Sequence, residues 1–408
     1  MDENVRDLLA GVPAPPPTRS AADLAQVARR RIRRRNIERY ALAGVMVAAV
    51  AVATPVAVAN TRGTAPNGTP PAASPRAAAP ITQCRLQKVA LPPGLAEKGV
   101  QRVEPVGVDP SGRYVIARTW RDYSSPAAIL WTDGRPEIVP VQGENVQPAA
   151  VNAGGLVMGI VYANGAWRSW VYRDGKVTQL PPPPGHPVDN MGLAVNAAGD
   201  VFGQADTPDV GTPDLVVWRA GNHYRPQILT PDEAAKVRAE FNNEGASAWL
   251  LTDEAGRVNT GKGTVAQLQT PPGVDWIQQT AVSGYWATGY GGLRAQREAQ
   301  PGGTAARKLP YKVIRWDLRT GQGAVLGDHP VYDITGPGAI SGISNPDVNA
   351  KGDALSAIQL HPAGGKPVTL PTTAGLTANA VAMNNTATVV VGYLYKGPTV
   401  RPAIWTCR

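Results

Sequence analysis

A unit that recurs through the C-terminal part of the chain constrains the fold more than any other feature. Each copy predicts a small apolar strand, a turn of the pattern Asp/Asn-x-x-Gly, a second strand, a third strand ending near a Trp, and a fourth strand. Asp or Asn first and Gly fourth favour a β-turn that is capped by its own side chain. The turns lie at 108–112, 151–155, 195–199, 252–256 and 348–352, with weaker copies near Ser283 and Asn384.

One such sheet would be marginal alone, and stacking in a ring would bury its apolar faces. Counting the weaker copies, the repeats predict an all-β fold, a seven-bladed β-propeller, with six blades as the alternative. A β-sandwich or a solenoid with the same strand order is the other possible fold. The 44 Gly and 39 Pro against 2 Phe favour short strands joined by turns. The third strands are expected to end at Trp131, Trp170, Trp218, Trp316 and Trp405.

The two ends of the repeat region complement each other. The last unit stops at 403–408 without a fourth strand, and the region begins at 84–92 with a fourth strand that has no partners of its own. One blade shared between them would close the ring. It would also bring Cys84 and Cys407, the only two cysteines, to neighbouring strand ends, where a disulfide is geometrically plausible.

Residues 40–60 contain no charged residue and, as a helix with a rise of ~1.5 Å per residue, would cross a bilayer. Six arginines fall within 29–35, directly before this segment, so the positive-inside rule places 1–39 in the cytosol and 83–408 outside the cell. A buried core helix and a secretory signal cleaved after Ala59 are the alternatives. An anchor is favoured because a cleaved signal normally has a shorter leader.

Two neighbouring segments complete this layout. Residues 61–82 are mainly Pro, Ala, Thr and Gly, which cannot bury a core, so we expect a flexible stalk. The arginine run could also bind phosphates of a nucleic acid. Beside an apolar span, contact with anionic lipids is the better interpretation, and no nucleic-acid partner is expected.

The tail carries two helix signals: an apolar stripe before a Pro-rich break, and a Ser20–Asp23 capping box that opens a second helix. This layout resembles single-pass proteins of GC-rich, actinobacterial-type genomes that accompany extracytoplasmic-function sigma factors. The resemblance implies a cytosolic protein partner, a sigma factor, for the tail. The repeats resemble, loosely, the extracellular bacterial repeat called HAF and WD-like repeats, which implies a propeller but no reaction. The stripe consists of Val5, Leu8, Leu9 and Val12.

No motif points to a particular chemistry. The patterns HExxH, CxxC and G-x-S-x-G do not occur, and no cofactor or metal is expected. The four histidines stand singly near turns, so we expect solvated turn residues. They are His186, His223, His329 and His361.

The loops that lead from one blade to the next gather at the mouth of a propeller, where ligands are often bound. Here these loops carry acids, amides and aromatic residues, a set that suits a cation or a polyhydroxyl ligand. The alternative is that they are solvated loop residues with no shared ligand. The residues are Glu104, Glu144, Asn145, Asp189, Asn190, Asp275, Trp276, Tyr332, Asp333 and Asn379.

These features predict a membrane-anchored binding or sensing protein without enzymatic activity. Its propeller would bind a cell-wall or glycan ligand, and its tail would meet a cytosolic partner. The alternatives are an extracellular hydrolase or lyase that uses paired carboxylates such as Asp189 and Asp333, and a structural scaffold for envelope proteins.

Overall fold

The computed structural model describes residues 81–95, 97–121, 124–186, 189–206, 213–243, 257–259, 265–293, 311–329, 347–356, 358–396 and 399–408. All of them belong to one compact unit, Met46–Arg408. The predicted tail, the membrane segment and all but the last two residues of the stalk lie outside the described residues. Within the described part, no helix is both long and apolar enough to cross a membrane.

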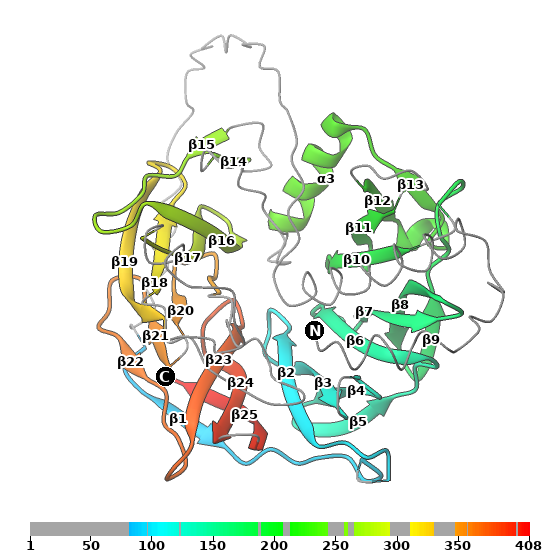
Figure 1. The fold of residues 1–408 in the computed structure, drawn as a ribbon, viewed down its shortest axis with the longest axis horizontal. Coiled ribbons are helices and arrows are strands. Elements are labelled where there is room, and N and C mark those ends of the chain that lie inside the picture. The colour runs from blue at the N-terminus through cyan, green and yellow to red at the C-terminus, as the bar shows by residue number, and fades with distance from the viewer. Residues whose placement is uncertain are drawn as a thin grey trace, which may run out of the picture. The chain divides into compact units, whose positions relative to one another are not determined.

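The described residues form seven antiparallel sheets that follow one another along the chain (Figure 1). The first three sheets have four strands each. They consist of β2 (Arg102–Val108), β3 (Tyr114–Trp120), β4 (Ala128–Thr132) and β5 (Arg135–Val139); β6 (Glu144–Val151), β7 (Val157–Ala163), β8 (Ala166–Arg173) and β9 (Lys176–Gln179); and β10 (Asn190–Val195), β11 (Val201–Ala205), β12 (Asp214–Trp218) and β13 (Pro226–Ile228), with the 3-10 helix η1 (Ala220–Asn222) between the last two.

The remaining sheets vary more in the number of strands described. The fourth has two, the fifth four, the sixth three and the seventh four. They consist of β14 (Arg257–Asn259) and β15 (Val265–Gln267); β16 (Trp276–Ser283), β17 (Trp286–Gly292), β18 (Tyr311–Asp317) and β19 (Gln322–His329); β20 (Ala354–Ser356), β21 (Gln359–His361) and β22 (Val368–Thr369); and β23 (Thr377–Met383), β24 (Val389–Lys396), β25 (Thr399–Cys407) and β1 (Cys84–Gln87).

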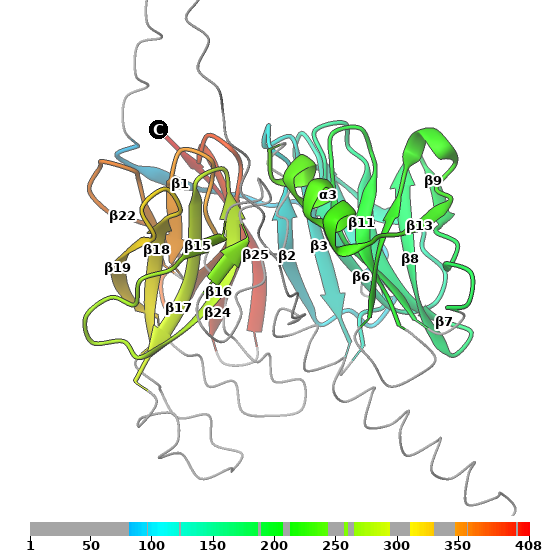
Figure 2. The same ribbon diagram turned by 90° about the horizontal axis from the view of Figure 1, so that it is seen from above.

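The sheets have the arrangement of a β-propeller. The first strand of each four-stranded sheet lies nearest the common centre, and its fourth strand lies at the periphery (Figure 1). Hydrophobic clusters fill the space between successive sheets, including one that joins Val391 of the seventh sheet to Val103 and Ile129 of the first. We call the side where the inner strands begin the mouth side, and the opposite side, with the hairpin turns of strands one to two and three to four, the turn side (Figure 2).

The predicted side-chain caps are confirmed at the described turns. The Asn152 Oδ1 accepts hydrogen bonds from the backbone N–H groups of Gly154 and Leu156, each at 3.0 Å. Its Nδ2 donates to the carbonyl oxygen of Asn196, the equivalent turn residue of the next sheet, at 2.8 Å. The cap therefore stabilises its own turn and also connects two sheets. Equivalent caps form at Asp109, Asn196, Asn349 and Asn384.

The third-strand tryptophans connect neighbouring sheets. All five are fully or almost fully buried, and the indole N–H of Trp218 donates to the carbonyl oxygen of Pro181, just after the outer strand of the preceding sheet, at 2.8 Å. Trp316 and Trp405 do the same with Gln269 and Pro371. Trp131 of the first sheet donates to Ala90, which follows β1, at 2.7 Å. Trp170 differs, since its buried indole N–H has no partner among the described residues.

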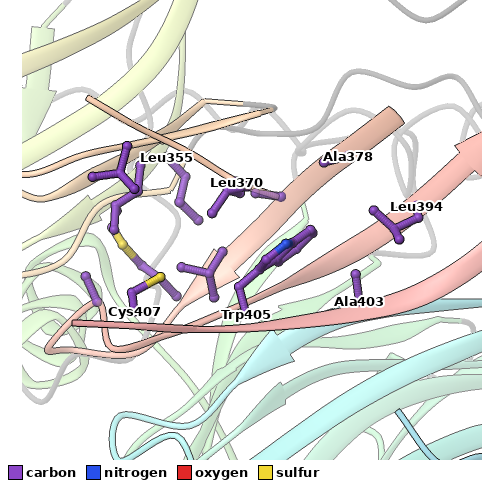
Figure 3. Packing of buried hydrophobic residues seen from close by; sticks show 13 residues of the cluster. Leu355, Leu370, Ala378, Leu394, Ala403, Trp405 and Cys407 are labelled. Atoms are coloured by element: carbon purple, nitrogen blue, oxygen red, sulfur yellow. The ribbon is translucent and has the colours of Figure 1, made fainter. Parts of the chain in front are cut away.

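Strand β1 forms the outer edge of the seventh sheet, beside the last strand of the chain. It pairs antiparallel with β25, with Cys84 opposite Cys407, and the predicted disulfide joins these two residues. Figure 3 shows Cys407 and Trp405 in a buried cluster with Leu355 and Leu370 of the sixth sheet. The cross-link is therefore built into a packed interface between two sheets.

Helix α3 (Pro231–Asn243) departs from the repeat, which predicted only strands here. Glu233 accepts hydrogen bonds from the Thr230 N–H at 2.8 Å and the Thr230 hydroxyl at 2.9 Å, which caps the first turn. Phe241 is fully buried against Phe202 of the third sheet. Glu240 pairs with Arg219, at the turn end of β12, at 2.9 Å. The helix thus runs from the mouth side toward the turn side, which is the direction that the inner strand of each four-stranded sheet takes.

Each four-stranded sheet has a bulge in its inner strand, and this bulge requires a small residue opposite it. The register shifts between Gly192 and Ala194 in the third sheet, and between Ala380 and Ala382 in the seventh. A Cβ atom on Gly203 would lie 2.2 Å from the Met191 carbonyl oxygen. The bulge of the third sheet therefore depends on glycine at this position. In each of these sheets the bulge also determines which face of the sheet the preceding inner-strand side chains lie on.

Candidate ligand site at the mouth side

Two of the predicted site residues occupy equivalent positions, one residue before the bulge of their inner strands. Glu104 lies opposite Arg118 of β3, and Asn379 lies opposite Tyr393 of β24. Glu104 is 1% exposed and Asn379 is fully buried. Their strands come from the first and the seventh sheets, which are neighbours in the fold although they are far apart along the chain.

These two side chains hold three buried polar atoms that have no well-aligned hydrogen-bond partner among the described residues. Glu104 Oε2 accepts from Arg118 Nε at 3.0 Å, whereas its Oε1 has none. Neither Oδ1 nor Nδ2 of Asn379 has a well-aligned partner, although the Tyr393 hydroxyl lies close to it. An unpaired buried polar group costs about 1–3 kcal/mol, so such atoms require an explanation when they gather in one place.

The electrostatics around Glu104 and Asn379 favour an uncharged ligand. Arg118 forms an ion pair with Glu104, so the two charges largely balance. Burial raises the pKa of Tyr393, and the nearby Glu104 carboxylate raises it further, so the phenol remains protonated. Together the group offers a carboxylate acceptor, an amide with donor and acceptor, and a hydroxyl. We call Glu104, Arg118, Asn379 and Tyr393 the mouth cluster.

Three other predicted residues already have protein partners. Asn145 Oδ1 accepts from the Ser125 N–H at 3.1 Å, Asp189 Oδ1 accepts from the Trp167 N–H at 2.7 Å, and Asn190 Oδ1 accepts from the Ser169 N–H at 2.7 Å. Each bond connects the start of an inner strand to the preceding sheet. These side chains therefore help to hold neighbouring sheets together, and only the Asn190 Nδ2 among their described atoms is buried without a partner.

The remaining predicted residues lie elsewhere on this side. Glu144 and Asp275 are exposed, at or next to the first residue of their inner strands. Trp276 is half-buried and packs edge-on against Tyr311, with ring centroids 5.4 Å apart. The structure does not bring these residues into the mouth cluster. Tyr332 and Asp333 lie outside the described residues.

Sequence reasoning missed Arg118 and Tyr393, which complete the mouth cluster from second strands. Only the strand register shows that they stand opposite Glu104 and Asn379. It also missed Trp120, whose ring lies 4.8 Å from the Arg118 guanidinium carbon and whose buried indole N–H has no partner. A sequence signal for Arg118 and Tyr393 did exist: each is a charged or aromatic residue that directly follows the small second-strand residue opposite the bulge.

The prediction that the histidines are solvated is wrong for two of them. His186 is buried, with Nε2 3.2 Å from the Asp214 carboxylate. His361 is buried with its Nε2 3.0 Å from the Ser356 hydroxyl, and burial lowers its pKa to about 4, with a further contribution from Arg315. In the part of the chain that the structure describes, no three His, Cys, Asp or Glu residues are placed to hold a metal ion.

Comparisons with known proteins show no family for this chain. No protein-family profile matches the sequence, and no curated protein matches it. Solved structures with a similar arrangement include an oligogalacturonate lyase from Vibrio parahaemolyticus (8% identity, TM-score 0.41, 80% of this chain and 97% of that chain) and a gluconolactonase from Xanthomonas campestris (12%, 0.31, 76% and 87%). A third is the Dos1 propeller (11%, 0.34, 72% and 75%).

Proposed function

We propose that this chain is a membrane-anchored binding protein whose exported domain, residues 83–408, binds a neutral polyhydroxyl ligand at the mouth cluster. The observation that carries the proposal is the set of three buried polar atoms on Glu104 and Asn379 that have no well-aligned partner in the described part of the chain. Sugar hydroxyls both donate and accept hydrogen bonds, and therefore match a carboxylate oxygen beside an amide and a phenol. The ion pair with Arg118 favours such a ligand over a cation, since it compensates the only carboxylate of the cluster.

The proposed domain is a propeller of seven blades in which β1 completes the last blade. Seven sheets in chain order support the blade count. The hydrogen bond from Trp131 to Ala90 supports the closure. It connects the first and last blades in the same way as the bond from Trp218 to Pro181 connects two blades that are consecutive in the chain. A closed ring holds the inner strands β2 and β23 side by side, which is what the mouth cluster requires.

The disulfide supports the proposed location outside the cytosol, where such bonds persist. In this proposal residues 40–60 anchor the chain in the bilayer and residues 1–39 remain in the cytosol. The tail then meets a cytosolic protein, for which a sigma factor is the candidate. A tail that captures no specific cytosolic protein in pull-downs would reduce this part of the proposal to plain anchoring.

Binding is tested with the full-length chain in detergent micelles and immobilised neutral cell-wall oligosaccharides. We expect the wild type to bind at least one of them, and Asn379→Leu to lose at least about tenfold in affinity because the amide is gone. Glu97→Gln, an exposed change on the connection between β1 and β2, serves as the control and should bind like the wild type. Equal binding by Asn379→Leu, or no binding by the wild type, would remove the mouth cluster as the site. Cleavage of a bound oligosaccharide would favour the hydrolase or lyase alternative.

A further inference from the structure

The described chain begins and ends on the turn side. The backbone N–H groups of Thr82 and Gln83 donate to the carbonyl oxygen of Arg408 at 2.9 and 3.1 Å, and β1 starts directly afterwards at Cys84. The third strand ends, and the fourth strand begins, on the turn side of each four-stranded sheet. The first described residues therefore lie on this side and not at the mouth.

The turn side is rich in exposed cations. Arg113 and Arg319 form ion pairs with Asp133 and Asp317 and so contribute little net charge. Many other exposed Arg and Lys side chains at the turns have no salt-bridge partner among the described residues, and few exposed acids accompany them. These cations are Arg85, Arg135, Arg173, Lys176, Arg225, Lys351 and Lys366.

The charge of the mouth side is more balanced. Exposed acids there stand beside exposed cations. The acids include Glu97, Glu144 and Asp275, and the cations include Lys88, Lys98, Arg121, Lys396 and Arg401. The exposed charges of the described fold are therefore unevenly distributed between its two sides. A surface with one basic side is expected to orient near an anionic plane.

An exposed aromatic residue accompanies the cations of the turn side. Tyr285, in the turn between β16 and β17, is 49% exposed, and the Arg319 guanidinium carbon lies 5.7 Å from its ring centroid. Tyr and Arg are residue types that favour the headgroup region of a bilayer, where one part of the side chain is apolar and the other is polar.

We propose that the turn side docks on the anionic lipid headgroups of the membrane that holds the anchor, so that the mouth cluster faces away from the bilayer. The inference rests on the anchoring in the proposed function. A coil with the length of the stalk, 61–82, has a root-mean-square span of only about 26 Å, which keeps the basic side close to the headgroups. Anionic lipids then attract the unpaired Arg and Lys side chains within a Debye length of ~8 Å.

The test uses the full-length chain in supported bilayers, with the height of the protein layer measured by neutron reflectometry. One bilayer contains phosphatidylcholine alone, and the other also contains phosphatidylglycerol. We expect the layer to lie against the headgroups only on the anionic bilayer, and to move outward by about 10 Å or more at ~1 M salt, where the Debye length falls to ~3 Å.

Two matched variants locate the charge that is responsible. Arg135→Glu/Lys176→Glu/Lys366→Glu reverses charge on the turn side and should raise the layer on the anionic bilayer. Lys98→Glu/Arg121→Glu/Lys396→Glu makes the same change on the mouth side and should leave the height unaltered. Equal heights on both bilayers, or equal responses of the two variants, would overturn the docking. Extraction of the wild type by alkaline carbonate would instead show that the anchor itself is wrong.

Discussion

Asn152 on the turn side and Asn379 on the mouth side are the same residue type, and both are buried, yet their surroundings differ. Every polar atom of the Asn152 side chain has a partner, whereas neither polar atom of Asn379 has a well-aligned partner among the described residues. The same contrast extends to the two sides of the fold, with the capped turns and the disulfide on one side and the mouth cluster on the other. The turn side thus contributes stability, and the mouth side retains unmet hydrogen-bonding capacity.

The largest effect on stability is expected when the disulfide on the turn side is removed. Cys84→Ala/Cys407→Ala should lower the free energy of unfolding by about 5 kcal/mol, because a cross-link between residues 323 apart restricts the unfolded chain strongly. Urea unfolding of the full-length chain in micelles, followed by Trp fluorescence, measures the loss. Reduced wild type should behave like the variant. A loss below about 1 kcal/mol would show that the turn side does not depend on this bond.

A smaller effect is expected at the capped turn itself. Asn152→Ala should destabilise the fold by about 1–3 kcal/mol, since two backbone N–H groups and the Asn196 carbonyl lose their partner. The same urea titration measures it. Asn222→Ala, at an exposed turn position without a side-chain hydrogen bond described, should change stability by no more than about 0.5 kcal/mol. Similar values for the two variants would contradict the role of the cap.

The smallest effect is expected at the mouth. Asn379→Leu replaces two unpartnered polar atoms with an apolar group of similar size, so the free energy of unfolding should change by less than about 1 kcal/mol, or increase. This is the variant that should lose the oligosaccharide. A destabilisation as large as that of Asn152→Ala would show that Asn379 is satisfied in solution, and the contrast between the two sides would disappear.

The repeated elements could be predicted from the sequence because their causes are local. A turn capped by Asp or Asn needs only residues a few positions apart, and the five third-strand tryptophans mark one position in successive units. The Cys84–Cys407 disulfide could also be predicted, because the two incomplete units at the ends of the repeat region complement each other. These predictions needed the order of the strands and not their exact register.

The mouth cluster could be predicted only in part, because it depends on register between strands. Glu104 and Asn379 were found from their place on connecting segments, whereas Arg118 and Tyr393 lie opposite them on second strands. Each inner-strand bulge shifts the pairing by one residue, and a shift of one residue reverses which side chains share a face. Periodicity alone does not reveal such shifts.

Helix α3 was missed although the sequence carries its signal. Thr230 and Glu233 form a capping box at its start, and Pro231 takes the first helical position. The expectation of another strand, which came from the repeat, outweighed this local pattern. The burial of Phe241 against Phe202, the only two Phe residues of the chain, then fixes the helix to the third sheet.

The position of the cystine has a mechanical consequence. A pull transmitted along the polypeptide from upstream of Cys84 would, without the bond, peel β1 from β25 one hydrogen-bonded pair at a time. Cys84 is the first residue of β1 and is joined to Cys407 at the far end of the chain. Tension arriving there is passed covalently into β25, a central strand of its sheet, before it can load the hydrogen bonds of the edge strand. A pull of this kind would therefore not unravel the sheet from its edge strand.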